Sequence, residues 1–135
     1  MALVMRRGNP AAGRNRLTLA DYAALTHVTV SIFGDGQTET DTALAAAGLD
    51  RRIACTTPHF IAALTAVAAT DMVTMLSRAF ARQYAGLLDL TLLEPPLPDV
   101  ALRTTLVWGA ARDNDRLLAW LRQVFSDVAS GIRVD

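Results

Sequence analysis

Two histidines, His27 and His59, are the side chains of this 135-residue sequence best suited to acid–base or metal chemistry. They fall on different expected elements, and no cluster of cysteines or carboxylates accompanies either at metal-ligand spacing. We therefore expect no metal site and no cofactor. The Gly-x-Ser-x-Gly elbow of a nucleophilic serine is absent, so no catalytic residues are assigned and an enzyme is not the leading interpretation. A small α/β hydrolase or transferase with His59 as its base stays open as an alternative.

A glycine pair and a group of acids also have simpler explanations than chemistry. Gly34 and Gly36 lack a third glycine, and the sequence contains no lysine, so a nucleotide-binding loop is not expected and a turn is favoured. Asp35, Glu39 and Asp41 gather at an expected helix start, where carboxylates stabilise the exposed amide groups. These acids are thus interpreted as capping residues.

Composition narrows the class of protein. The sequence is 52% hydrophobic and 19% charged, which is enough to build one core, and thirteen basic residues balance thirteen acidic ones. No positive excess exists to bind nucleic acid, and no apolar run is long enough to cross a membrane. The single Cys55 and the absence of a secretory signal pattern indicate a cytoplasmic protein, with Cys55 expected as a small buried side chain on a strand.

Strand and helix patterns alternate along the sequence. Strands are expected at 2–6, 27–33, 51–56, 71–76, 87–93 and 100–108, and helices at 19–25, 38–47, 57–69, 77–85 and 113–129. Thr18 and Thr38, each with an acid three residues later, are predicted helix caps, and Gly48 is a predicted helix end. The alternation predicts an α/β fold whose mainly parallel sheet is flanked by helices.

His59 stands out by its expected position. Thr57 is the predicted cap of the helix, Pro58 its first residue, and the stripe at Phe60, Ile61, Leu64 and Val67 its buried face. His59 points about 100° away from that stripe, in the first turn, where unpaired backbone amides gather. In a parallel sheet this turn lies at the carboxyl end of a strand, where open α/β sheets bind ligands.

The last helix has a wide apolar face. Its apolar positions lie within one arc of about 160°: Leu117, Leu118, Trp120, Leu121, Val124, Phe125 and Val128. Burying them contributes roughly 10 to 20 kcal/mol before opposing terms, so this face is expected to have a partner surface.

Five segments, in this order, resemble the C-terminal part of the effector-binding region of LysR-type transcriptional regulators. They are HVTVS (27–31), DTALAAAGLDR (41–51), PHFIAALTAVAATDMVTML (58–76), LEPPLPDVALRTTLVWG (93–109) and AWLRQVF (119–125). The PHF triplet is most similar to the branch of NahR-like and NodD-like regulators that responds to aromatic compounds. The resemblance covers nearly the whole sequence.

The resemblance implies a lobe like those of type II periplasmic binding proteins, present here in truncated form. Residues 1–7 would be a crossover strand, 8–97 the second lobe, and 98–135 a return strand and final helix of the first lobe. The side chains implied to contact a small aromatic or carboxylate inducer are Ser31, Phe33, Gly34, Asp35, Thr57 and His59. DNA would be bound only through an N-terminal helix-turn-helix domain outside this sequence, and a lobe of a solute-binding protein is the alternative.

Truncation also implies a partner for the last helix. Its apolar face would cover a sheet that this sequence lacks, so we expect a homo-oligomer, including a dimer that exchanges residues 99–130 between chains.

Overall fold

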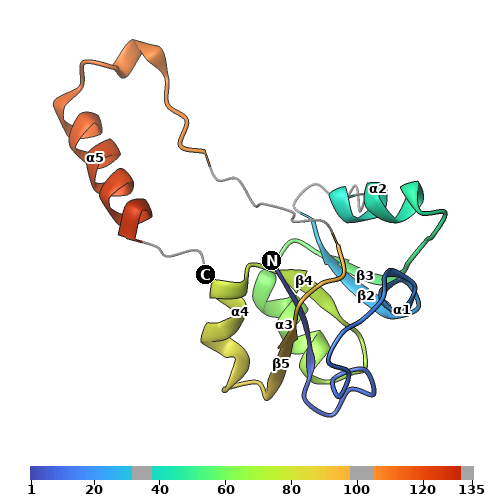
Figure 1. The fold of residues 1–135 in the computed structure, drawn as a ribbon. Coiled ribbons are helices and arrows are strands. Elements are labelled where there is room, and N and C mark those ends of the chain that lie inside the picture. Colours follow the sequence, from blue (N-terminus) through green and yellow to red (C-terminus); the bar gives the residue numbers. More distant parts are fainter. Residues whose placement is uncertain (32–37, 98–104, 132–135) are drawn as a thin grey trace. The chain divides into compact units, whose positions relative to one another are not determined.

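The computed structural model of the chain describes residues 1–31, 38–97 and 105–131. It divides into two compact units, Met1–Leu102 and Arg103–Asp135 (Figure 1). Within the described residues, strands occur only in the first unit. No helix in these described ranges has the length and apolar character to cross a membrane.

The first unit alternates strands and helices in the predicted order. Its strands are β1 (Ala2–Arg6), β2 (Thr26–Val30), β3 (Arg52–Thr57), β4 (Thr74–Leu76) and β5 (Leu90–Leu93). Its helices are α1 (Leu19–Ala23), α2 (Glu39–Ala46), α3 (Phe60–Ala68) and α4 (Arg78–Ala85). Type and order are confirmed for these nine elements, and the ends differ from expectation by a few residues.

The strands form a three-stranded sheet in the order β4-β1-β5 and a two-stranded sheet of β2 and β3. β2 and β3 pair in parallel, β1 pairs antiparallel with both β4 and β5, and a parallel bridge between His27 and Val73 joins the two groups. Four strands therefore share one direction, as predicted, whereas β1 runs against them. The direction of β1 was not predicted, because its neighbours β4 and β5 follow it by about seventy or more residues, and no local pattern sets such a pairing.

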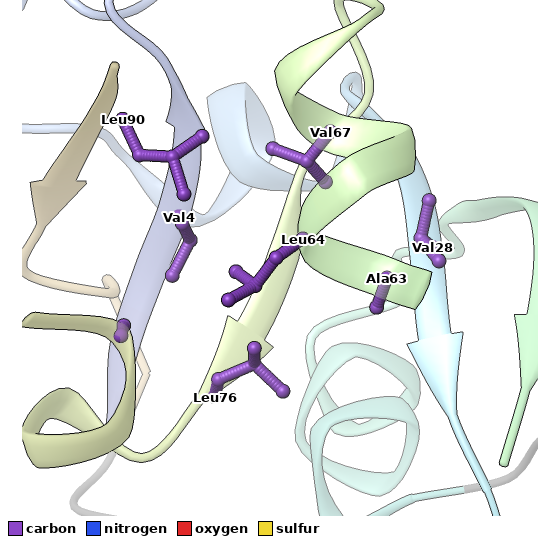
Figure 2. Close-up of a cluster of buried hydrophobic side chains, with 8 residues drawn as sticks. Val4, Val28, Ala63, Leu64, Val67, Leu76 and Leu90 are labelled. Atoms are coloured by element: carbon purple, nitrogen blue, oxygen red, sulfur yellow. The ribbon is translucent and has the colours of Figure 1, made fainter. Parts of the chain in front are cut away.

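One face of the sheet carries α3 and α4. Figure 2 shows Leu64 of α3 pointing toward Val4 of β1 and Leu76 of β4, with Val28 of β2 beside the same helix. The buried side chains of this cluster are Val4, Val28, Ala63, Leu64, Val67, Leu76, Ala81 and Leu90. These buried side chains come from four strands and two helices, so this cluster is the main core of the unit.

The opposite face is covered by α1, Leu44 of α2 and the loop before α1. Its buried cluster is Leu3, Met5, Ala11, Leu17, Tyr22, Leu44 and Val73. Leu3 and Met5 alternate with Val4 along β1, so successive side chains of one strand enter the two cores.

Local capping chemistry fixes the starts of α1 and α2. The carboxylate of Asp21 accepts from the Thr18 backbone N–H at 2.9 Å, and that of Asp41 accepts from the Thr38 N–H at 2.7 Å. Both predicted caps are confirmed. Gly48 follows α2 with φ of +69°, the left-handed conformation that glycine adopts at helix ends, as predicted.

Three expectations for β3 and α3 were wrong. β3 continues to Thr57, so the cap of α3 is His59 and not Thr57. Cys55 is exposed instead of buried, because β3 pairs along one edge with β2 and its residues from Arg52 to Thr56 are all exposed. Of the predicted stripe of α3, Leu64 and Val67 are buried as expected, whereas Phe60 and Ile61 are exposed. Ala63 completes the buried face.

The second unit contains a short 3-10 helix, η1 (Ala110–Arg112), and the long helix α5 (Arg116–Gly131). The strand expected at 100–108 lies partly outside the described residues, and its described part, 105–108, is not a strand. A strand needs a hydrogen-bonded neighbour, and no described strand pairs with this segment. Asp115, not Asp113 or Asn114, caps α5, since its Oδ1 accepts from the Leu117 N–H at 2.9 Å.

Candidate functional site

The candidate site lies where β2 and β3 end, an area here named the carboxyl edge and defined by Ser31, Thr57 and His59. Parallel pairing places Val30 opposite Thr57, so the two strands finish side by side. The Ser31 N–H then donates to the Thr57 carbonyl oxygen at 3.1 Å. The chain leaving β2 is thus attached to the last residue of β3.

Thr57 links the same strand end to α3. Its hydroxyl oxygen accepts from the His59 N–H at 3.2 Å, across the turn made by Pro58. His59 has extended backbone angles, φ −115° and ψ 119°, as a helix cap requires. The sequence-predicted residues Ser31, Thr57 and His59 are therefore brought together by one backbone–backbone hydrogen bond and one bond from a backbone N–H to the Thr57 hydroxyl oxygen.

The first turn of α3 differs from those of α1 and α2. The His59 side chain makes no capping hydrogen bond, and the first turn holds no acidic residue. The first backbone bond of the helix runs from the Ala63 N–H to the His59 oxygen at 3.1 Å, so the preceding N–H groups lack helical acceptors. Such amides, at the positive end of a helix, favour a negatively charged group.

The remaining predicted contacts, Phe33, Gly34 and Asp35, lie outside the described residues. Their assignment stays a prediction. His59 itself is exposed, and in the described part of the chain no group of three or more His, Cys, Asp or Glu side chains is placed to hold a metal.

His27 occupies a different environment from His59. It is fully buried on β2, and its Nε2 lies 3.0 Å from the Tyr22 carbonyl oxygen. A carbonyl oxygen only accepts, so Nε2 carries the proton. Burial lowers the pKa of His27 to about 4, with the nearby positive charge of Arg51 acting in the same direction. A neutral, buried imidazole of this kind is part of the core.

From the sequence alone, no role was assigned to Arg51. The Arg51 side chain is 5% exposed, and its Nε and Nη2 donate to the two carboxylate oxygens of Asp41 at 2.7 and 2.9 Å. Nη2 also lies 3.1 Å from the Thr38 hydroxyl oxygen. The ten-residue spacing of Asp41 and Arg51 within the DTALAAAGLDR segment was the signal, but it does not reveal a contact by itself.

These hydrogen bonds stabilise the ionised form of the Asp41 carboxylate. Its partial burial would raise its pKa, but hydrogen bonds from Arg51 and Thr38 outweigh burial and hold the pKa below its usual value. Asp41 is therefore ionised at neutral pH, and its hydrogen bond from the Thr38 N–H confirms its predicted capping role.

Comparison with known proteins identifies the family. The family model of the LysR substrate binding domain matches residues 1–130. The HTH-type transcriptional activator NagR of Ralstonia sp is 33% identical over 129 residues, which are 94% of this chain and 42% of NagR. The HTH-type transcriptional activator NahR of Pseudomonas putida is 30% identical over 91% of this chain and 41% of its own length.

A solved structure agrees with these relatives. The regulatory domain of MexT, a transcriptional activator in Pseudomonas aeruginosa, is 29% identical and superposes with a TM-score of 0.76 over 93% of this chain and 60% of that chain. The chain spans about two fifths of the length of NagR and NahR. The match over residues 1–130 and the shared fold show that the chain belongs to the LysR substrate-binding domain family, the effector-binding part of LysR-type transcriptional regulators.

Proposed function

We propose that the chain binds a small organic anion at its carboxyl edge and is the sensing part of a transcriptional regulator. The observation that carries the proposal is the joint attachment of Ser31, Thr57 and His59 beside the uncapped first turn of α3. Polar side chains, a histidine and unpaired amides at one strand end form the surroundings that a ligand carboxylate requires.

An aromatic or otherwise apolar body on the anion is supported by the residues that follow His59. Phe60 and Ile61 begin α3 and are both about half exposed, so apolar surface adjoins the amide groups. Phe60 also contacts Phe80 of α4, with ring centroids 5.6 Å apart. A ring packed beside this surface would bury apolar area while its carboxylate meets the helix start.

The proposed mechanism is a shift between conformations. Residues 1–7 would be a crossover strand, residues 8–97 one lobe of a two-lobed domain, and residues 98–135 a return to the other lobe. A ligand held between lobes would favour one lobe arrangement and thereby one arrangement of a DNA-binding segment. The names of NagR and NahR, HTH-type transcriptional activators, support such a segment. The chain would act in the cytoplasm as a sensor and not as an enzyme or a solute-binding lobe.

Benzoate, the simplest aromatic carboxylate, tests the site. In amide-resolved NMR of the full chain, we expect millimolar benzoate to shift the N–H signals of Ser31 and of residues 59–62, because these groups surround the carboxylate. Binding is expected to be weak, since only one side of the proposed cleft is contributed by residues 8–97. His59→Ala should weaken the shifts further by removing a contact.

Benzyl alcohol is the matched control, since it keeps the ring and lacks the charge. It should produce much smaller shifts at residues 59–62. Equal shifts with both compounds would contradict the anion site, and benzoate shifts confined to other parts of the chain would contradict the proposed function. Micromolar affinity by calorimetry would contradict the one-sided cleft.

Self-association through α5 is a second part of the proposal. Five large apolar side chains of α5 are exposed: Leu117, Trp120, Val124, Phe125 and Val128. Covering them contributes several kcal/mol, so pairing of chains is expected, including by exchange of residues 99–130. Light scattering should detect dimers at high micromolar concentration, and Trp120→Glu should reduce them while Arg116→Glu does not. A stable monomer under these conditions would contradict this part.

A further inference from the structure

α5 (Arg116–Gly131) buries none of its residues against the described part of the chain. A single helix of sixteen residues is only marginally stable in water by its own propensity. Its apolar side chains include two large aromatic ones, Trp120 and Phe125, which are 60% and 58% exposed. The helix therefore needs a partner surface.

One side of α5 is already occupied by its own unit. The Arg122 guanidinium carbon lies 4.9 Å from the centre of the Trp108 ring, and Arg122 Nη2 donates to the Asp113 carbonyl oxygen at 3.0 Å. Trp108 Nε1 donates in turn to Asp113 Oδ1 at 2.9 Å. These contacts attach residues 108–113 to the side of the helix that carries Arg122, so a partner has to cover the other sides.

The apolar residues on those other sides have the spacing of a helix pair. Four of them follow one another at intervals of four, three and four residues, which are the a and d positions of two heptads. We call these four residues the seam: Leu117, Leu121, Val124 and Val128. Trp120 and Phe125 flank the seam on its two sides. A second helix with the same spacing fits such a seam, and α5 of a second copy carries it.

We infer that α5 pairs antiparallel with α5 of a second copy; the inference rests on the proposed self-association. In this arrangement Leu117 faces Val128 of the second copy and Leu121 faces Val124, so every layer combines one leucine with one valine. Parallel pairing would set leucine on leucine and valine on valine and give layers of unequal width. Antiparallel pairing also brings opposite ends of the two helix dipoles together.

The residues beside the seam suit the same register. It places Leu118 beside Phe125 of the second copy and Trp120 beside Asp127, whose carboxylate can accept from the indole N–H. Gln123 Nε2 donates to Asp127 Oδ1 at 2.8 Å and so holds this carboxylate on the flank of the helix.

The area of this contact sets its strength. Covering the five exposed apolar side chains of α5 on both copies removes roughly 1,000 Å² of surface, which is about the lower limit for a specific interface. We therefore expect a weak dimer that forms at high micromolar concentration.

Paramagnetic relaxation enhancement between copies measures the direction of pairing. The native Cys55 is replaced by Ser in all chains, and a nitroxide is attached to a chain with Ser130→Cys, which is mixed with a ¹⁵N-labelled chain that carries no nitroxide. Only contacts between copies then broaden the ¹⁵N signals. We expect the strongest broadening at residues 115–119, because antiparallel pairing brings the end of one α5 to the start of the other. A nitroxide at Arg116→Cys should instead broaden residues 127–131.

Other results would overturn the inference. Strongest broadening of residues 127–131 by the nitroxide at position 130 would show parallel pairing, and broadening confined to residues 1–97 would show that α5 covers the first unit of another copy. Either result leaves self-association intact. A stable monomer in light scattering would overturn self-association and the antiparallel pair together. Benzoate shifts at residues 59–62 test the anion site separately.

A pair of charge substitutions tests the seam itself. Val124→Asp places a carboxylate at the middle of the seam and should raise the dissociation constant of the dimer at least about tenfold. Ser126→Asp places the same charge on the opposite, exposed side of α5 and should leave the constant unchanged. Equal effects of the two substitutions would contradict the seam. Should circular dichroism show that Val124→Asp loses the helix, the nitroxide pattern decides alone.

Discussion

Replacing Leu64 with Ala is expected to lower the free energy of unfolding by about 3 kcal/mol. Leu64 is fully buried at the middle of α3, and its side chain contacts the cluster that includes Val4 and Leu76 (Figure 2). Truncation removes apolar contacts and leaves a cavity between a helix and a sheet that cannot close without shifting β1 or β4. Urea denaturation followed by circular dichroism measures the change as a lower midpoint at constant slope.

Ile61→Ala is the matched control on the same helix. Ile61 is 45% exposed, so less apolar area is lost, and Ala has the higher helix propensity. We expect a loss below about 1 kcal/mol. A larger loss for Ile61→Ala than for Leu64→Ala would contradict the exposure of Ile61 seen in the structure.

The parts of the fold that sequence predicted are those fixed by neighbouring residues. The caps at Thr18 and Thr38 and the helix end at Gly48 depend on groups within three or four positions, so their residue types reveal them. The alternation of strand and helix depends similarly on local periodicity, and it led to the correct fold class.

The parts that sequence missed depend on distant pairings. β1 lies between two strands that follow it by about seventy or more residues, and its direction has no local cause. The exposure of Ile61 on α3 and of Cys55 on β3 also depends on which elements cover them, and no local pattern shows that. The periodicity of α3 identified an apolar helix but not which side of it the sheet would cover.

The candidate site shows the same division. Parallel strands bring their carboxyl ends to one edge, so the approach of Ser31, Thr57 and His59 was predictable from the order of elements. The contact of Arg51 with Asp41 was not, because two adjacent arginines at a strand start are usually solvated. Only the structure shows that one of them turns inward onto the cap of α2.

The second large effect is expected from His27, through pH. Its folded-state pKa of about 4 lies below the ordinary 6.5, so below pH 6.5 the unfolded chain binds a proton that the folded chain does not. The associated stability is fully present above pH 6.5 and is lost as the pH falls toward 4. Integration over this window gives a loss of about 3 kcal/mol, of which about 2 kcal/mol falls between pH 7 and pH 5.

The cause is the burial of the imidazole, which makes its charged form costly. Protonation adds a hydrogen to Nδ1, a buried atom without a hydrogen-bond partner in the described structure, and Arg51 adds a repulsive charge. Asp41 affects stability in a lower pH range. Because its pKa is lowered, the stability that its ionised carboxylate contributes is lost only at pH values below the ordinary Asp pKa of 3.8. The change in the free energy of unfolding between pH 5 and pH 7 therefore reports on the histidines and not on Asp41.

His27→Gln removes the buried imidazole and is the variant for this measurement. Urea midpoints determined across the window should show the loss of unfolding free energy between pH 7 and pH 5 reduced by about 2 kcal/mol in His27→Gln. Gln keeps an N–H donor for the Tyr22 carbonyl, so the loss of a hydrogen bond does not obscure the result. An unaltered loss in His27→Gln would show that His27 is protonated in the folded chain, which the burial of its ring opposes.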